Sequence, residues 1–239
     1  NQFTLAFWNN DVDSNTLITD FNWHHWAVTY DAASKTQRIY LDGNLDATRV
    51  TTSDYQGSGF LYIGQDFYGN NRFNGNIDEL CIWNTVRTAE QINGSKNCEL
   101  AGNETGLEAY YNFNQGIDAA NNSTITSLTD ATANANNGTL TNFALTGTTS
   151  NWLAGSPVTT GSIVPSVATV TTPVVNYQGD TANPLTATVC ANGTGLLWYT
   201  TATGGTGSTT APTPSTTTVG NTSYWVSSTN ANKCESART

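Results

Sequence analysis

Short runs of alternating apolar and polar residues recur along most of this chain, separated by Gly, Asn, Asp and Pro. Four of them are FTLAFW at 3–8, HHWAVTYD at 24–31, QRIYLDGNLDA at 37–47 and GFLYIGQ at 59–65. A period of two residues is typical of half-buried β-strands, and Asp42-Gly43 provides a favoured two-residue hairpin turn. The pattern predicts an all-β protein built from sandwiches.

The pattern continues to the end of the chain, with one helical exception. Further predicted strands are GNIDELCIWN at 75–84, LEAYYNFNQG at 107–116, LTATV at 185–189, GLLWYTT at 195–201 and TSYWVSST at 222–229. The segment TAEQINGS predicts a short helix, because Thr88 as N-cap and Gln91 three residues later form a capping box. Residues 156–172 carry no aromatic or charged side chain, which indicates either an interdomain linker or the first edge strand of a second domain. We expect domains at 1–156 and 173–239, a linker at 157–172, and a truncated last strand.

Composition excludes some classes of protein. The net charge is −10, and only 8 Lys and Arg occur among 239 residues, so a basic nucleic-acid-binding patch is not expected. No apolar stretch reaches the roughly 18 residues of a membrane helix. Charged residues make up 11% of the chain, and a polar, uncharged composition of this kind is frequent in secreted proteins with many turns. Since the chain contains no Met, we expect it to be a processed or internal piece of a longer protein.

Four cysteines indicate an oxidising compartment. They are Cys81, Cys98, Cys190 and Cys234. Their separation into two pairs favours one disulfide in each domain, Cys81–Cys98 and Cys190–Cys234. Four cysteines also allow two other connectivities. Buried free thiols are the alternative to any disulfide. No zinc-type spacing is present.

The adjacent His24 and His25 raise the question of a metal or catalytic site. Neighbouring side chains on a strand point to opposite faces, so the two rings cannot chelate one ion together. The chain has no third histidine and no G-x-S-x-G elbow. We interpret this stretch as a strand of mostly buried aromatic residues with a satisfied or half-exposed histidine.

The first part of the chain resembles the laminin-G-like/pentraxin superfamily, whose fold is a concanavalin-type jelly roll. The resemblance is carried by WHHWAVTYDAASKTQRIYLDGNL and LYIGQDFYGNNRFNGNIDELCIWNTVRTAEQI, in family order, over roughly residues 1–113. It implies a jelly roll that lacks its first strands. In pentraxin-like members, calcium is held just before an F-W strand and in the loop after I-L-G-Q. The corresponding positions here are Asn1, Gln2, Gln65 and Asp66.

The last part of the chain resembles Ig-like modules of large Bacteroidetes surface proteins. The matching pieces are WYTTATGGTG, APTPST, SYWVS and CESAR, and Trp198 follows Cys190 as in the Ig Cys–Trp–Cys pattern. The resemblance implies that the chain is part of a secreted or cell-surface multidomain protein. The specific expectation is an adhesin exported by a type IX system in gliding bacteria.

Three further groups of residues are candidate functional sites. Asp11 and Asp13 in NNDVDSN form either a second cation loop or an ordinary Asx-rich turn. Asp78 and Glu79 invite comparison with glucanase carboxylates, but adjacent acids on a strand point apart, which favours a structural role. Aromatic loop residues could stack on sugar rings or anchor the loops; they are Tyr55, Phe67, Tyr68 and Phe73.

From these observations we expect no enzyme, and no catalytic residues. The predicted function is adhesion or binding of extracellular glycans or surface polymers, with Ca²⁺ as the candidate cofactor and neighbouring domains of the parent protein as further partners. The alternatives are an accessory part of a glycoside hydrolase and a purely structural stalk.

Overall fold

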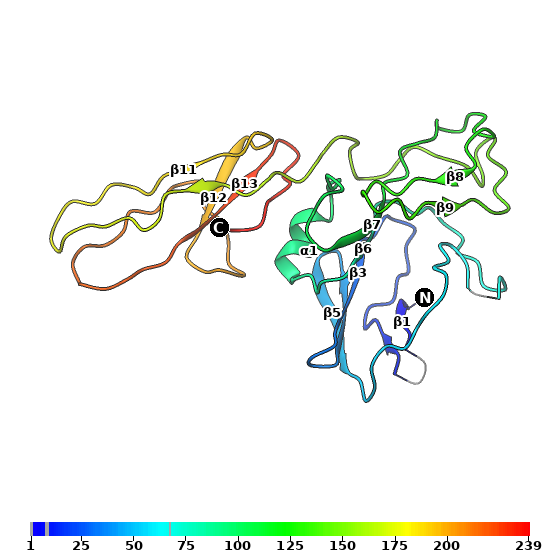
Figure 1. Ribbon diagram of the computed structural model, residues 1–239, viewed down its shortest axis with the longest axis horizontal. Helices are drawn as coiled ribbons and strands as arrows, with labels where there is room; N and C mark the ends of the chain where they lie inside the picture. The colour runs from blue at the N-terminus through cyan, green and yellow to red at the C-terminus, as the bar shows by residue number, and fades with distance from the viewer. Residues whose placement is uncertain (1, 8–9, 67) are drawn as a thin grey trace. The chain divides into compact units, whose positions relative to one another are not determined.

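The computed structural model describes residues 2–7, 10–66 and 68–239. The chain divides into two compact units, each built from two stretches of sequence. The N-terminal unit comprises Asn1–Arg87 and Gly102–Val158, and the C-terminal unit comprises Thr88–Ala101 and Thr159–Thr239. The described regular structure is almost entirely β, which confirms the predicted fold class (Figure 1).

The strands are short, and those that form sheets pair antiparallel. In the N-terminal unit they are β1 Thr4–Leu5, β2 Val12–Asp13, β3 Trp26–Asp31, β4 Thr36–Leu41, β5 Asn44–Val50, β6 Leu80–Trp83, β7 Leu107–Tyr111, β8 Ser127–Leu128 and β9 Gly138–Thr139. The C-terminal unit contains α1 Ala89–Ser95, β10 Thr169–Val170, β11 Ala187–Thr188, β12 Gly195–Tyr199 and β13 Trp225–Thr229.

The β3–β4–β5 sheet is the main element of the N-terminal unit, drawn in blue in Figure 1. Asp42 and Gly43 connect β4 to β5 with φ angles of 51° and 84°. Positive φ at both central residues is the requirement of a type I′ turn, so the predicted hairpin is confirmed. Ile39 and Ala47 on this sheet pack with Val12 into a core that Phe3, Leu5 and Trp26 cover.

A second core of the N-terminal unit forms around the β6–β7 pair. Ala109, Tyr111 and Leu128 are buried there, with Leu80 and Ile82 packed against them. Tyr110 of β7 is 1% exposed, so this strand is buried on both faces. That burial explains why the run LEAYY contains only one charged residue.

The predicted strand at 59–65 does not form. Gln65 makes an isolated bridge with Arg72, and the rest of the segment has no strand partner in the described part of the chain. A strand needs a neighbour to take up its backbone N–H and C=O groups, and without one residues 52–62 remain exposed. The alternation of apolar residues was therefore not sufficient to place this segment in a sheet.

The C-terminal unit is built around the β12–β13 pair. Trp198 and Val226 pack with Ala168, and Val170 and Leu185 lie against them. Because Ala168 is buried and Thr169–Val170 form β10, the end of the expected 157–172 linker belongs to this unit as a strand.

Helix α1 begins as the sequence predicts. The side chain of Thr88 accepts the N–H of Gln91, and the Gln91 side chain accepts the N–H of Thr88, which completes the capping box. The helix belongs to the C-terminal compact unit, whereas the expected domain boundaries place it inside the first domain.

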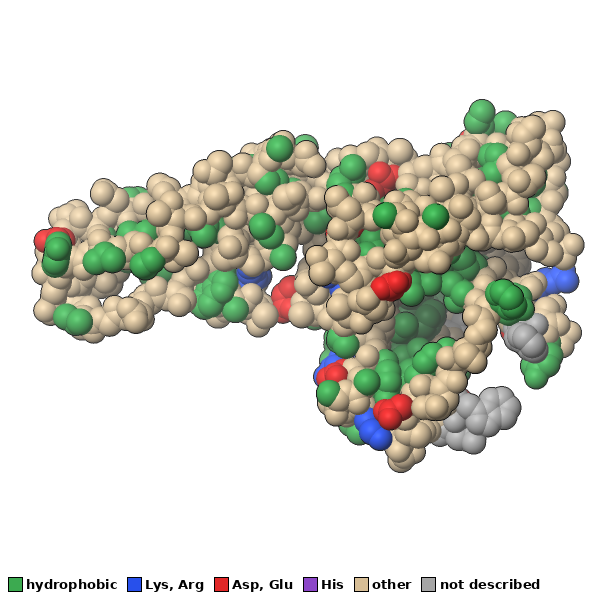
Figure 2. Space-filling view, viewed as in Figure 1, with side chains coloured by type: hydrophobic (Ala, Val, Ile, Leu, Met, Phe, Trp, Pro, Cys, Tyr) green, Lys and Arg blue, Asp and Glu red, His purple; other side chains and the backbone are tan. Residues whose placement is uncertain are grey.

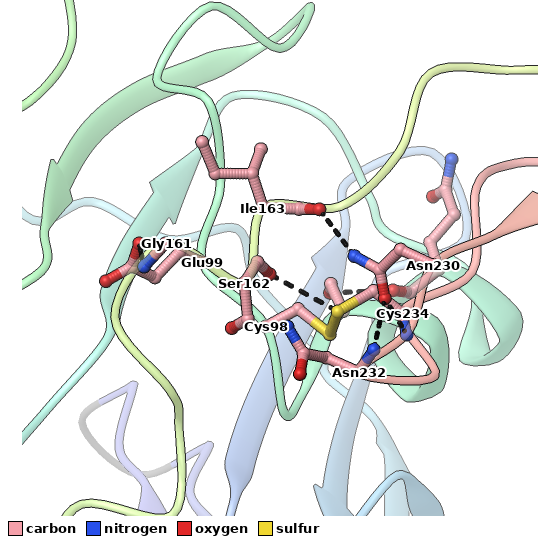
Figure 3. Close-up of a disulfide and its surroundings, with 10 residues drawn as sticks. Cys98, Glu99, Gly161, Ser162, Ile163, Asn230, Asn232 and Cys234 are labelled. Atoms are coloured by element: carbon pink, nitrogen blue, oxygen red, sulfur yellow. Dashed lines mark hydrogen bonds between the residues drawn. A yellow bond between two sulfur atoms is a disulfide. The ribbon is translucent and has the colours of Figure 1, made fainter. Parts of the chain in front are cut away.

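The predicted disulfide pairing is wrong, because the structure joins Cys98 to Cys234 and leaves Cys81 and Cys190 unbridged (Figure 3). Cys98 and Cys234 both belong to the C-terminal unit, although 136 residues separate them in sequence. Cys81 lies on β6 of the other unit, where burial raises the pKa of its thiol to about 12. Sequence proximity suggested the pairing Cys81–Cys98, but the tertiary structure assigns these two residues to different compact units.

Candidate functional site

Exposed aromatic side chains are concentrated between residues 55 and 73. Tyr55, Phe60, Tyr68 and Phe73 are 58%, 89%, 78% and 60% exposed. When several large apolar side chains are exposed close together in the chain, they indicate an interaction surface more often than a single exposed residue does. On the face shown in Figure 2, hydrophobic side chains are exposed among uncharged polar atoms, and charged side chains are few.

Tyr55 is held in a defined position. A Cβ atom built on Gly57 would lie 1.9 Å from the Tyr55 hydroxyl oxygen, so the ring occupies the space that a side chain at 57 would fill. Tyr55 also contacts Phe7, with 5.1 Å between ring centroids, and Phe7 contacts Tyr30 edge to face at 4.8 Å. The Tyr30 hydroxyl donates to Asp54 at 2.8 Å. Gly57 and Phe7 are thus the neighbours of a ring that is still more than half exposed.

Phe73 shares one of these features. A Cβ on Gly75 would lie 2.8 Å from two atoms of the Phe73 ring, so this ring also lies over a glycine two residues later. Its backbone N–H donates to Gly64 at 2.9 Å, next to the Gln65–Arg72 bridge that closes the loop carrying Tyr68. The aromatic-x-Gly spacing is visible in the sequence, but its meaning appears only with the ring positions. Of the four predicted aromatic residues, Phe67 lies outside the described residues.

Asp66 organises the loop between Gln65 and Arg72. Its carboxylate accepts the backbone N–H of Asn70 at 2.9 Å and the side-chain amide of Asn71 at 2.7 Å. Partial burial pushes the pKa of Asp66 up, but these hydrogen bonds, with the N–H of Gly69, outweigh it, so the pKa lies below its ordinary value. Both carboxylate oxygens are therefore engaged in holding the loop.

The described residues do not by themselves fit the predicted calcium site. Calcium takes six to eight oxygen ligands, usually with several carboxylates. Asn1 lies outside the described residues, the amide of Gln2 donates to the carbonyl oxygen of Ser14 at 2.9 Å, and Asp66 supplies the one carboxylate of the set. Within the described ranges, no three His, Cys, Asp or Glu side chains are placed to hold a metal ion. Calcium binding stays a prediction.

Asp11 and Asp13 each bind the chain nearby. Asp11 accepts the N–H of Phe7 at 2.7 Å, and Asp13 accepts the hydroxyl of Thr4 at 2.5 Å. The Asp11 contact reaches back four residues toward β1, and the Asp13 contact joins cross-strand partners of β1 and β2, so each carboxylate is engaged locally.

The acidic pair at 78–79 lies just before β6. Glu79 adopts a left-handed backbone with φ of 55°, and its carboxylate accepts the hydroxyl of buried Tyr110 at 2.5 Å. An acid engaged with a buried tyrosine serves the core, so this geometry favours the structural role.

His24 lies between two carboxylates that the sequence analysis did not assign to it. Its Nδ1 is 2.9 Å from Asp42 and its Nε2 is 3.0 Å from Asp20. The hydrogen bond to Asp42 has the largest effect on the pKa of His24 and raises it, and the hydrogen bond to Asp20 raises it further. The i, i+4 spacing of Asp20 and His24 was a signal for one partner, whereas Asp42 approaches only through the β4–β5 turn.

Two family matches agree with this architecture. Residues 1–93 match the family described as the concanavalin A-like lectin/glucanases superfamily, and residues 164–239 match the Ig-like domain described as CHU_C associated. The chain thus contains one region similar to concanavalin A-like domains and one region similar to Ig-like domains. Tyr55, Phe73 and the glycines beneath them all lie in the concanavalin A-like match. No helix among the described residues is both long and apolar enough to cross a membrane.

Two known proteins are similar to parts of the chain. The Sushi, von Willebrand factor type A, EGF and pentraxin domain-containing protein 1 of Rattus norvegicus is 27% identical over 111 residues. That match covers 42% of this chain and 3% of the relative, so the chain spans a small fraction of that protein's length. A solved structure of a proposed carbohydrate binding protein from Bacteroides ovatus ATCC 8483 is 24% identical, with a TM-score of 0.44, and covers 56% of this chain and 38% of that chain.

Proposed function

We propose that the concanavalin A-like domain is a non-catalytic glycan-binding module that serves in adhesion. The observation that carries the proposal is that Tyr55 and Phe73 are both more than half exposed, with each ring lying over a glycine two residues later. A rigid aromatic face loses little conformational entropy when a ligand covers it, and the apolar face of a sugar ring is a ligand of matching shape. The description of the matched family as lectins and glucanases is consistent with a carbohydrate ligand.

The charge of the protein favours uncharged glycans. The net charge is −10, and Asp54 and Asp66 lie in the same exposed segment as the aromatic residues. Like charges disfavour association at ordinary ionic strength, so a polyuronate or sulfated polymer would be repelled. Neutral polysaccharides are therefore the proposed ligand class.

A binding experiment with the full chain tests this proposal. We expect the protein to bind at least one member of a panel of uncharged polysaccharides, and Tyr55→Ala and Phe73→Ala to weaken that binding about tenfold or more, as loss of a central aromatic contact does at interfaces. Tyr177→Ala is the matched control, because Tyr177 is a 79% exposed tyrosine in the other compact unit. Gly57→Ala should weaken binding as well, since it displaces the Tyr55 ring without removing it.

The outcomes separate the proposal from its alternatives. Binding that survives both alanine variants would contradict the roles of Tyr55 and Phe73, and absence of binding across the panel would favour a structural stalk. Release of reducing sugar would instead indicate a part of a glycoside hydrolase. The cellular setting we propose is a secreted or cell-surface protein exported by a type IX system in a gliding bacterium; the Ig-like match and the disulfide support an extracellular location.

A further inference from the structure

The segment 88–101 is built into the C-terminal unit along its whole length. Near its start, the carboxylate of Glu90 accepts the N–H of Gly204 at 3.0 Å. Near its end, the Glu99 carbonyl oxygen accepts the N–H of Val164 at 2.9 Å, and its carboxylate accepts the N–H of Gly161 at 2.6 Å. Between these points Cys98 joins Cys234. Hydrogen bonds on both sides of the bridge therefore hold it in a defined setting.

The partner side of the bridge is equally ordered. Asn230 donates its amide to the carbonyl oxygen of Ile163 at 2.9 Å, and its own side-chain oxygen accepts the N–H groups of Asn232 and Cys234, both at 3.0 Å (Figure 3). Cys234 is 0% exposed. A reductant in solution therefore has no direct access to this sulfur in the folded unit.

The positions of the two cysteines in the chain give the bridge a mechanical consequence. Strands β7 to β13 all lie between Cys98 and Cys234, and five residues follow Cys234 to Thr239. A covalent link between two points of a chain removes the intervening residues from the path of a force that pulls on the ends. The intervening path here is 136 residues long.

We propose that the Cys98–Cys234 bridge is a load bypass: tension along the chain passes through the disulfide and not through the backbone of the bridged residues, which include all the strands of the C-terminal unit. The inference rests on the connectivity and is independent of glycan binding. An adhesion module that bears force would in this way stretch only in the residues before Cys98 and after Cys234.

The hydrogen bonds of the residues after Cys234 are the first to break when the C-terminal end is pulled. Thr239 exchanges two backbone hydrogen bonds with Val226, at 3.0 and 3.1 Å, and Ser236 donates its N–H to Ser228 at 2.9 Å. The Glu235 carboxylate accepts the hydroxyl of Tyr199 at 2.6 Å. Pulling on the C-terminal end loads β12 and β13 only through these contacts, and once they break the tension passes to the bridge.

Single-molecule stretching of the full chain, held at residues 1 and 239, tests the bypass. The measured quantity is the total contour length after complete stretching. We expect the unreduced protein to be shorter than the Cys98→Ser/Cys234→Ser double variant by roughly 450–490 Å, from about 3.3–3.6 Å per extended residue over the bridged path. Because the stretched length does not depend on folding, the comparison holds even if the double variant is unstable.

A second double variant, Cys81→Ser/Cys190→Ser, is the matched control. It should keep the short contour length of the parent, because both bridging cysteines remain. An unreduced parent that stretches to its full length would overturn the proposal. A short contour length that persists in Cys98→Ser/Cys234→Ser, or disappears in the control variant, would overturn it as well, since another pair of cysteines would then carry the bridge.

Discussion

Residue by residue, the most unusual environment in the core is that of Gln37. It lies on β4 with 0% exposure, and neither its amide nitrogen nor its amide oxygen has a hydrogen-bond partner among the described residues. A buried polar group without a partner costs about 1–3 kcal/mol.

We therefore expect Gln37→Met to stabilise the protein. Methionine has a similar length and flexibility but no donor or acceptor to leave unpaired, so the free energy of unfolding should rise by about 1–3 kcal/mol. Chemical denaturation of the two proteins measures the difference. Gln37→Glu, which buries a charge at the same place, should destabilise; equal or lower stability of the methionine variant would contradict the argument.

His24 gives the N-terminal unit a pH dependence. A neutral imidazole has one N–H, so hydrogen bonds to both Asp20 and Asp42 require the protonated ring. The pKa of His24 is raised in the folded state. The stability that this arrangement contributes is therefore fully present below about pH 6.5, the ordinary histidine value, and is lost as the pH rises through the raised pKa.

The difference in melting temperature between the parent and His24→Gln, followed from pH 5 to 9, measures this contribution. We expect the parent to be more stable at low pH and the two proteins to converge at high pH. Asp20→Asn should reduce the difference. It should not disturb the β4–β5 turn, because Asp42 there still accepts the N–H of His25 at 2.9 Å. A difference that does not change with pH would contradict a protonated His24.

Among the elements, the loop between β8 and β9 depends on one carboxylate. Asp130 is 5% exposed and accepts the N–H groups of Tyr110, Thr132 and Asn136 at 2.8–2.9 Å, together with the Thr132 hydroxyl. Burial pushes the pKa of Asp130 up, but these hydrogen bonds outweigh it and hold the pKa below its ordinary value. The loop is thus fastened to a buried strand through a charged acceptor.

Asp130→Ala should lower the free energy of unfolding by about 1–3 kcal/mol or more, because it leaves several buried N–H groups unpaired. Since the pKa is lowered on folding, this contribution is present above the ordinary Asp value and is lost as the pH falls through the lowered one. Denaturation at pH 7 and at pH 3 measures both effects. The parent and variant should differ less at pH 3; an equal difference would contradict the role of the ionised carboxylate. Asp118→Ala is a control, because Asp118 is an exposed acid that accepts one N–H, from Ala154.

The other elements follow from local chemistry to different degrees. The β4–β5 hairpin and the start of α1 were predictable, because a turn and a capping box depend on residues within four positions of each other. The segment at 59–65 was not, because a strand exists only if another segment pairs with it. The exposure of Tyr55 and Phe73, on either side of this segment, is what makes them candidates for binding.

For the whole molecule, the decisive feature is that each compact unit uses two stretches of the chain. Residues 88–101 leave the first unit and are fastened into the second by Glu90, Cys98 and Glu99. Domain boundaries inferred from composition assume that a domain is continuous in sequence, and they could not detect this exchange.

The sequence by itself determined the all-β class, the two family resemblances, the Asp42-Gly43 hairpin and the Thr88 capping box. The resemblances rest on ordered motifs, and the other three features rest on side-chain periodicity or on contacts between near neighbours; all of these are present directly in the order of residues. The tertiary structure alone decided that Cys98 pairs with Cys234, that Glu79 accepts a hydrogen bond from Tyr110, and that His24 lies between Asp20 and Asp42. Apart from the local Asp20–His24 contact, these contacts join residues far apart in the chain. Packing selects their partners, and a local sequence pattern carries no information about packing.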